Sequence, residues 1–175
     1  MTWRRLVEWD ADVSARLRIA ERPGWLRSCA IALAHSGDSW LWWPGLALAW
    51  WAGSGFWRSW AAGLLGGTII LAAFVMATKF SIRRPRPEGE WGGLYRRTDP
   101  HAFPSGHAAR VFAIAAMAAG LGPWWMAVTL GIWAPLVCLA RVAMGVHYVS
   151  DVVAGAMLGA AAGGLMLAWD LAFRR

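Results

Sequence analysis

Two histidines and an aspartate in this chain have the types and spacing for nucleophilic and acid-base chemistry. His147 and Asp151 lie four residues apart, so on a helix their side chains share one face within hydrogen-bonding reach. A carboxylate behind an imidazole fixes its tautomer and leaves the other ring nitrogen able to attack. His107 follows Ser105 and Gly106 at the start of an apolar segment, where it is placed to give a proton to a leaving oxygen.

Basic side chains at the ends of three segments would attract an anion to these groups. Lys79 is the only lysine among 17 basic residues, which indicates a position that needs a compact ammonium. Arg86 is held between two prolines, and Arg141 offers a planar fork that suits phosphate. Ser105 is a natural N-cap, so the first amides of the helix that starts at Gly106 would also bind phosphate.

This combination is what hydrolysis of a phosphate ester requires. Cations and oriented amides stabilise charge on the equatorial oxygens, while the nucleophile and the leaving group lie in line. The acidic residues near the motifs, Glu88, Glu90 and Asp99, lie in a polar loop and form no cluster suited to a binuclear metal site. We therefore expect no metal and no other cofactor.

The ordered motifs resemble the three-part signature of the type 2 phosphatidic acid phosphatase (PAP2) superfamily. The matching segments are Lys79-x6-Arg86-Pro87, Pro104-Ser105-Gly106-His107 and Arg141-x5-His147-x3-Asp151. The resemblance implies a helical, metal-independent membrane phosphatase in which His147 is transiently phosphorylated, Asp151 orients it and His107 protonates the leaving group. It further implies that the phosphoryl oxygens are held by Lys79, Arg86, Ser105, Gly106 and Arg141.

One position departs from the family pattern. The third motif often has serine before its arginine, and here that residue is Ala140. A hydrogen bond to a charged partner, worth about 1 to 3 kcal/mol, would be missing.

The composition predicts that these residues are carried by an integral membrane protein. The chain of 175 residues is 58% hydrophobic and only 15% charged, and it contains 15 tryptophans. We predict one all-α membrane domain over residues 1–175, a bundle of about six transmembrane helices. The apolar segments are residues 25–36, 39–53, 59–80, 105–121, 124–143 and 149–171.

Three parts of this domain are distinguished by their patterns. Residues 1–22 predict an amphipathic helix on the membrane surface, residues 25–171 the transmembrane bundle, and residues 88–103 a polar loop beside the site. The first two apolar segments are short for a hydrocarbon core of about 30 Å, so we expect one of them to be tilted, extended or incompletely spanning. Glycines 155, 159 and 163 recur every four residues and predict close approach of another helix backbone.

Six alternating spans would return both ends of the chain to one side of the membrane, opposite the motifs. Lysines and arginines are slightly more numerous on the side of the ends, so the positive-inside rule favours cytoplasmic termini and an extracytoplasmic site. The charged residues near the N-terminus interrupt any signal-peptide pattern, so we expect none to be cleaved. The predicted location is the cell (inner or plasma) membrane, with multiple passes.

The formal charge of +7 comes from basic residues scattered at segment ends. This predicts contact with anionic membrane lipids and not with nucleic acid. Arg83 and Arg84 are interpreted as part of such a juxtamembrane cluster. His101 is interpreted as an exposed loop residue, and His35 and Asp38 receive no role from the motifs.

The leading hypothesis is therefore hydrolysis of a lipid phosphate or diphosphate. Candidate substrates are a polyprenyl diphosphate, phosphatidic acid, phosphatidylglycerophosphate and a lipid-linked sugar phosphate. One alternative is a phosphotransferase that passes the phosphoryl group from His147 to another lipid. Another is a non-catalytic lipid-binding or transport protein, in which the charges mark a path through the bilayer.

Overall fold

The computed structural model describes residues 3–89, 91 and 99–173. Within these residues the chain forms seven α-helices and no β-sheet, which confirms the all-α prediction. The helices are α1 (Trp3–Arg16), α2 (Trp25–Ser36), α3 (Ser39–Ala52), α4 (Gly55–Ile82), α6 (Gly106–Leu121), α7 (Trp124–Ala143) and α8 (Val149–Phe173).

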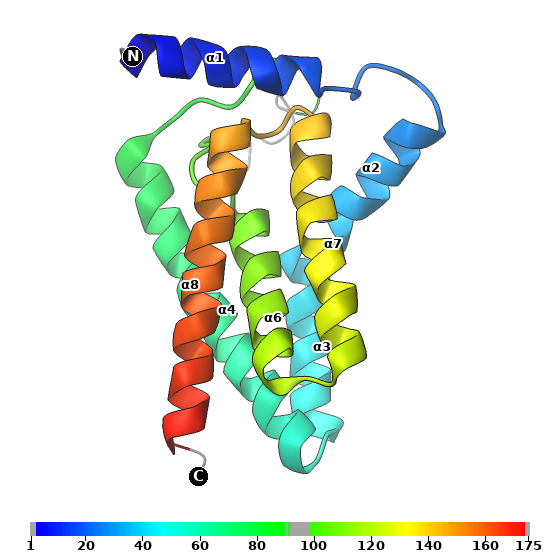
Figure 1. Ribbon diagram of the computed structural model, residues 1–175, viewed down its shortest axis with the longest axis vertical. Helices are drawn as coiled ribbons and strands as arrows, with labels where there is room; N and C mark the ends of the chain where they lie inside the picture. Colours follow the sequence, from blue (N-terminus) through cyan, green and yellow to red (C-terminus); the bar gives the residue numbers. More distant parts are fainter. Residues whose placement is uncertain (1–2, 90, 92–98, 174–175) are drawn as a thin grey trace.

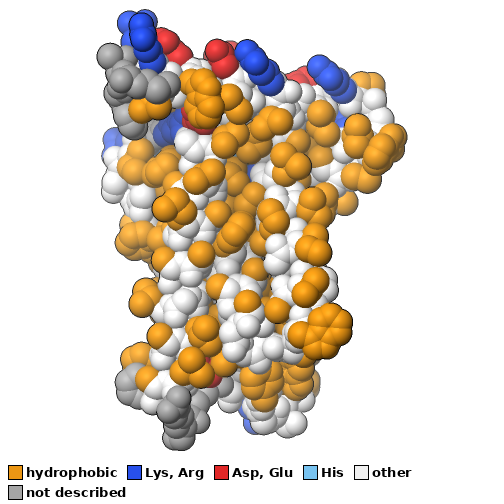
Figure 2. Space-filling view, in the orientation of Figure 1, with side chains coloured by type: hydrophobic (Ala, Val, Ile, Leu, Met, Phe, Trp, Pro, Cys, Tyr) orange, Lys and Arg blue, Asp and Glu red, His pale blue; other side chains and the backbone are white. Residues whose placement is uncertain are grey.

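The outer surface of the bundle is apolar, as a hydrocarbon environment requires. Among the described helices, α4, α7 and α8 are long and apolar enough to cross a membrane, and α6 is a shorter apolar helix. Large hydrophobic side chains such as Ile70, Met157 and Leu165 are about 70% exposed to the surroundings. Figure 2 shows hydrophobic side chains along the flank, whereas charged ones gather at the end formed by α1.

Helix α6 lies inside the bundle and packs most extensively on α8. A Cβ atom added at Gly159 would lie 2.0 Å from the Ala109 carbonyl oxygen, and one at Gly155 would lie 2.4 Å from that of Ser105. The predicted close backbone approach along this strip is thus confirmed. It brings the first residues of α6 and α8 together, and the Ser105 amide donates a hydrogen bond to the Asp151 carbonyl oxygen at 2.9 Å.

Helices α2 and α3 follow one another toward the far end of the bundle and share one passage across it (Figure 1). With 12 and 14 residues they reach only about 18 and 21 Å, so each is too short to span alone. The segment from His35 to Asp38 is therefore a break in direction and not a reversal.

The prediction that both ends of the chain lie opposite the motifs is wrong. Helix α1 lies across the same end of the bundle as the starts of α6 and α8, whereas α8 ends at the other end (Figure 1). The error follows from counting α2 and α3 as two complete spans, which adds one reversal to the chain. Without that reversal, the numbers of lysines and arginines at the two ends no longer favour an extracytoplasmic site.

Candidate active site

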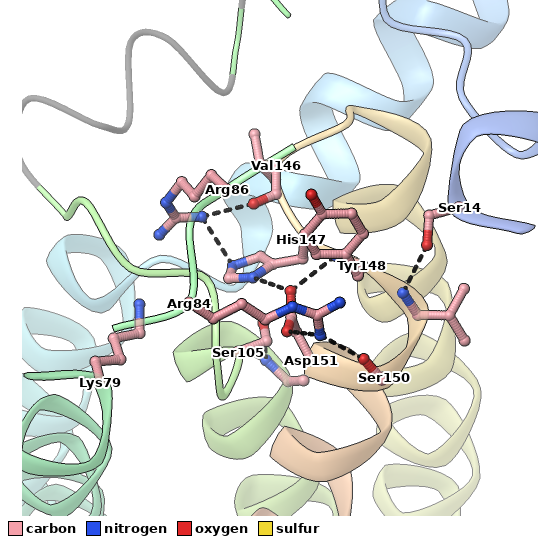
Figure 3. Close-up of polar contacts among 12 residues, drawn as sticks. Ser14, Lys79, Arg84, Arg86, Ser105, Val146, His147, Tyr148, Ser150 and Asp151 are labelled. Atoms are coloured by element: carbon pink, nitrogen blue, oxygen red, sulfur yellow. Dashed lines mark hydrogen bonds and ion pairs between the residues drawn. The ribbon is translucent and has the colours of Figure 1, made fainter. Parts of the chain in front are cut away.

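His147 lies just before α8 and is held between a carboxylate and a guanidinium (Figure 3). Its Nδ1 atom lies 3.7 Å from Asp151 Oδ2, and its Nε2 atom lies 3.2 Å from Arg86 Nη1. The same Asp151 oxygen accepts a hydrogen bond of 2.8 Å from the Tyr148 amide. Because His147 and Asp151 are almost completely buried, the imidazole can move little and its Nε2 atom points toward the cations.

The three predicted cations reach this imidazole from different elements and are buried with it. Lys79 and Arg141 lie in the last turns of α4 and α7, and Arg86 follows α4. Arg86 Nη1 donates a hydrogen bond to the Val146 carbonyl oxygen at 2.7 Å, which fixes the guanidinium beside the ring. Burial, and then the charges of these cations, hold the pKa of His147 well below its ordinary value, so the imidazole is neutral at neutral pH.

A carboxylate occupies the space between two of these cations. Asp99 forms an ion pair with Lys79, and its Oδ2 atom lies 2.8 Å from Arg86 Nη2. Arg86 Nε also donates to the Asp99 carbonyl oxygen at 2.7 Å. Sequence reasoning placed Asp99 only in the polar loop 88–103, of which residues 90 and 92–98 lie outside the described residues. An acidic side chain in this position shows that the pair of cations binds an anion.

The start of α6 forms the opposite wall. Ser105 Oγ accepts a hydrogen bond of 3.4 Å from the Ala108 amide, so the predicted N-cap is confirmed. Gly106 and His107 line a cavity of about 230 Å³ together with Lys79 and Asp99. This cavity continues as a groove between α3, α4 and α6, and its apolar lining is Leu71, Ala72, Val75 and Met76.

The structure thus brings together all eight residues that the motifs singled out, at one end of the bundle. The charges of His107, Arg141, Lys79 and Arg86 all act on His147, which indicates a shared site. Ala140, at the position where the family motif often has serine, has no hydroxyl group to donate to a phosphate. It packs in an apolar cluster with Ala30 and Ala34 of α2.

Arg84 belongs to this site, and its interpretation as a lipid-facing cation is wrong. Its Nη1 atom lies 2.8 Å from Asp151 Oδ1, and its Nη2 atom lies 2.7 Å from Asp10 Oδ2. The guanidinium also stacks over the Tyr148 ring at 4.1 Å. Arg83, by contrast, is exposed and donates to the Phe80 carbonyl oxygen, so the two neighbouring arginines have different roles.

Helix α1 supplies polar groups to the first turn of α8 that sequence reasoning did not identify. Ser14 Oγ accepts from the Val149 amide at 2.9 Å, and Asp10 Oδ1 accepts from the Ser150 amide at 3.0 Å. Burial opposes ionisation of Asp10, but hydrogen bonds from Ser150 and Arg84 outweigh it and lower the pKa of this carboxyl. The sequence signal for these contacts was weak: Asp10 and Ser14 are small polar residues four positions apart, so they share one face of the amphipathic helix.

A comparison with protein families decides the class of this site. A family model described as the PAP2 superfamily matches residues 60–175. The chain belongs to the PAP2 superfamily.

Relatives of this PAP2 chain act on lipid-linked phosphates. The decaprenylphosphoryl-5-phosphoribose phosphatase of Mycolicibacterium smegmatis is 34% identical over 150 residues, which cover 82% of this chain and 78% of the relative. The lipid A 1-phosphatase of Porphyromonas gingivalis is 31% identical over 126 residues, which cover 67% of this chain and 26% of the relative.

Two crystal structures share the fold. The transmembrane PAP2-type phosphatidylglycerolphosphate phosphatase from Bacillus subtilis has a TM-score of 0.79 at 23% identity, covering 98% of this chain and 89% of that one. Aquifex aeolicus LpxE has a TM-score of 0.70 at 23% identity, covering 90% and 93%. The family match and the relatives identify this PAP2 chain as a membrane lipid phosphatase.

Proposed function

We propose that the enzyme hydrolyses a lipid phosphate through a phosphohistidine at His147. The observation that carries this proposal is the position of His147 Nε2 at 3.2 Å from Arg86 Nη1, with Asp151 behind the other ring nitrogen. Nε2 would form a bond to phosphorus while the bond from phosphorus to the leaving oxygen breaks. Asp151 would stabilise the imidazolium that results.

The other residues divide the remaining work. His107 would donate a proton to the leaving oxygen and then take one from the water that breaks the P–N bond, which returns both histidines to their starting state. Lys79, Arg86 and Arg141 would neutralise the phosphoryl oxygens, and the Ser105 hydroxyl and the Gly106 amide would orient them. The incoming phosphate would displace Asp99 from Lys79 and Arg86.

We propose a lipid-linked sugar phosphate as the substrate class. The apolar groove between α3, α4 and α6 is lined also by Lys79 and His107, so a lipid tail would lie in it while the phosphate reaches the cations. The relative from M. smegmatis is named for a phosphate on a polyprenyl-linked ribose, which supports the same class. The other candidates are a polyprenyl diphosphate, phosphatidic acid and phosphatidylglycerophosphate, which serve as competitors in a substrate panel.

We further propose that the end of the bundle carrying the site faces the cytoplasm. Apart from the arginines that serve the site, basic residues lie in α1, in the turn after it, at the start of α2 and at the end of α4. The described part of the opposite end has Arg58, in the first turn of α4. The positive-inside rule, applied to this arrangement, favours the reverse of the orientation expected from the sequence. A C-terminal alkaline phosphatase fusion should then be active and a C-terminal green fluorescent protein fusion dark. The opposite pattern would restore the outward-facing site.

The catalytic proposal is tested by phosphate release from purified protein in EDTA. Wild-type enzyme should release phosphate from a short-chain prenyl-linked sugar phosphate, and His147→Ala should lower kcat/KM on the order of 10⁴-fold or more. Undiminished turnover by this variant would remove His147 as the nucleophile. His101→Ala is the matched control, since His101 contacts the Phe80 ring beside the site but lies outside the groups assigned to catalysis.

Isotope incorporation separates hydrolysis from phosphotransfer. In ¹⁸O-labelled water, a hydrolase should release phosphate that carries one solvent oxygen per turnover. Loss of substrate without labelled phosphate, together with a newly phosphorylated lipid, would favour the transferase.

A further inference from the structure

We propose that Asp38, in the break between α2 and α3, is the positioning residue that holds His107 for proton transfer. The proposal rests on the proposed hydrolysis and adds to it a second carboxylate–imidazole pair. Asp38 lies outside all three motifs, and in sequence it is 69 residues away from His107. Only the fold brings the two side chains together.

The contacts of Asp38 fix both of its carboxylate oxygens. Oδ1 lies 2.5 Å from His107 Nε2. Oδ2 lies 2.8 Å from His35 Nδ1 and accepts a hydrogen bond of 2.7 Å from Trp40 Nε1. The Asp38 residue itself is only 8% exposed. A buried carboxylate with this set of partners has one orientation, and it passes that orientation to the His107 ring.

The backbone of the break is fixed to the helix that carries His107. Arg110, one turn further along α6, donates from Nη1 to the Gly37 carbonyl oxygen at 2.5 Å. A Cβ atom at Gly37 would lie 3.1 Å from both Val111 and Val137, so this segment passes close to α6 and α7. The interruption between α2 and α3 thus delivers Asp38 to the active site.

Asp38 also balances the charges around His107. Positive charges come from Arg110 on α6, Arg141 on α7 and Lys79 on α4, and the imidazole of His147 lies before α8. The acidic groups on this side are Asp38 and, in the same cavity, Asp99, while His35 of α2 lies behind Asp38. An imidazolium is disfavoured by burial and by neighbouring cations, and the carboxylate bonded directly to the ring acts in the opposite direction, in favour of a proton on His107.

The proton transfer that follows is balanced within the ring. With Nε2 bonded to Asp38, the proton that leaves for the departing oxygen comes from Nδ1. Asp38 keeps Nε2 protonated as the ring becomes neutral. In the second half of the reaction Nδ1 takes a proton from water as the P–N bond breaks, and the starting state returns.

The test compares two substrates that differ in how much they need an acid. A prenyl phosphate has a poor leaving oxygen that must be protonated, whereas p-nitrophenyl phosphate has a good one that leaves with little help. Asp38→Asn should lower kcat/KM for the prenyl phosphate by about tenfold or more, because general acid catalysis is typically worth about 10²–10⁴-fold. Its kcat/KM for p-nitrophenyl phosphate should stay within about twofold of wild type.

The ratio of the two activities is the decisive number. It does not depend on the fraction of folded enzyme, so a less stable variant still gives a clear result. Asp12→Asn makes the same change of charge on an exposed residue of α1 and should leave the ratio unchanged. Asp38→Glu, which keeps a carboxylate but moves it, should give an intermediate ratio.

A double variant tests whether Asp38 acts through His107. His107→Gln with Asp38→Asn should be no slower on the prenyl phosphate than His107→Gln alone. An unchanged ratio in Asp38→Asn, or a further loss in the double variant, would overturn the role of Asp38. If wild-type enzyme releases phosphate from neither substrate, it is the proposed hydrolysis that fails.

Discussion

The two histidines of the site are held in different ways. On the nucleophile side, His147 and Asp151 have side chains that are 1% and 0% exposed, and Arg84 and α1 close over them. On the acid side, the side chains of His107 and Asp38 are 17% and 11% exposed, and His107 lines the apolar groove. The difference agrees with the proposed roles, in which a phosphorylated His147 stays fixed while the leaving lipid and the incoming water pass beside His107.

The largest loss of activity in this comparison is expected for Asp151→Asn, and its substrate dependence should distinguish Asp151 from Asp38. Asp151→Asn should lower kcat/KM by about 10³- to 10⁴-fold, because an amide favours the wrong tautomer of the nucleophile. The loss should be similar for the prenyl phosphate and for p-nitrophenyl phosphate, unlike the selective loss in Asp38→Asn. A larger loss of kcat/KM for the prenyl phosphate than for p-nitrophenyl phosphate in Asp151→Asn would mean that Asp151 and Asp38 do not have distinct roles.

A smaller loss is expected when the support behind Asp151 is removed. Arg84→Met deletes the cation that bonds both Asp151 and Asp10, and it should lower kcat/KM by about 10- to 100-fold for both substrates. Outer residues that orient functional groups typically contribute this much. Arg83→Met is the matched control, because Arg83 is exposed and has no contact with either carboxylate. Equal losses of kcat/KM in the two variants would contradict a role of Arg84 in the site and favour its interpretation as a membrane-surface cation.

The close packing of α6 against the glycines of α8 can be tested by measuring the stability of variants. Gly159→Ala places a Cβ atom against the backbone of α6 and should destabilise the protein by about 1–3 kcal/mol. Gly164→Ala, five residues further along α8, has no atom within 4 Å of its added carbon and should be neutral or slightly stabilising. Thermal unfolding in detergent measures both. A similar melting temperature for the two variants would contradict the close approach of α6 and α8.

Asp99 and phosphate should compete for Lys79 and Arg86, and removal of Asp99 should change the inhibition constant of phosphate by a few-fold. Asp99→Asn removes the carboxylate that pairs with Lys79 and Arg86, so inorganic phosphate should inhibit at a lower concentration. Glu88→Gln changes an exposed charge near the other end of the same loop and serves as the control. Inhibition constants measured with p-nitrophenyl phosphate would show the difference. Weaker inhibition in Asp99→Asn would show that Asp99 favours anion binding and does not compete with the anion.

The pH profile gives the smallest and most specific signal. The nucleophile must be neutral, and burial together with Arg86, Arg141 and Lys79 lowers the pKa of His147. The acid limb of kcat/KM should therefore lie well below pH 6.5, and activity should fall only as the pH drops through that lowered pKa. Lys79→Met removes one positive charge and should move the limb to higher pH. A limb that stays in place would exclude an effect of Lys79 on His147.

Sequence reasoning recovered the motif residues because each lies at the end of an apolar helix, where spacing and burial constrain it. Lys79 ends α4, Ser105 caps α6 and His147 precedes α8. Helix geometry alone predicts their common membrane face. The glycine strip of α8 was predictable for a similar reason, since close helix approach requires small residues at a spacing of four.

The residues that sequence reasoning missed come from elements without regular spacing to the motifs. Asp10, Asp38 and Arg84 reach the site only through tertiary contacts, and nothing local distinguishes Arg84 from Arg83. The turn before Asp38 was also ambiguous, because hydropathy records an interruption in an apolar run but not whether the chain reverses there. The short lengths of α2 and α3 were the available signal.

The bonds from α1 to the first turn of α8 have a consequence for substrate choice. A helix that lies in the plane of the interface keeps a constant depth, and Ser14 and Asp10 tie that depth to residues 149 and 150, next to the nucleophile. His147 is thereby held at a set height relative to the headgroups. For the proposed substrate class we therefore expect selection by the distance of the phosphate from the hydrocarbon, which a sugar between lipid and phosphate would set.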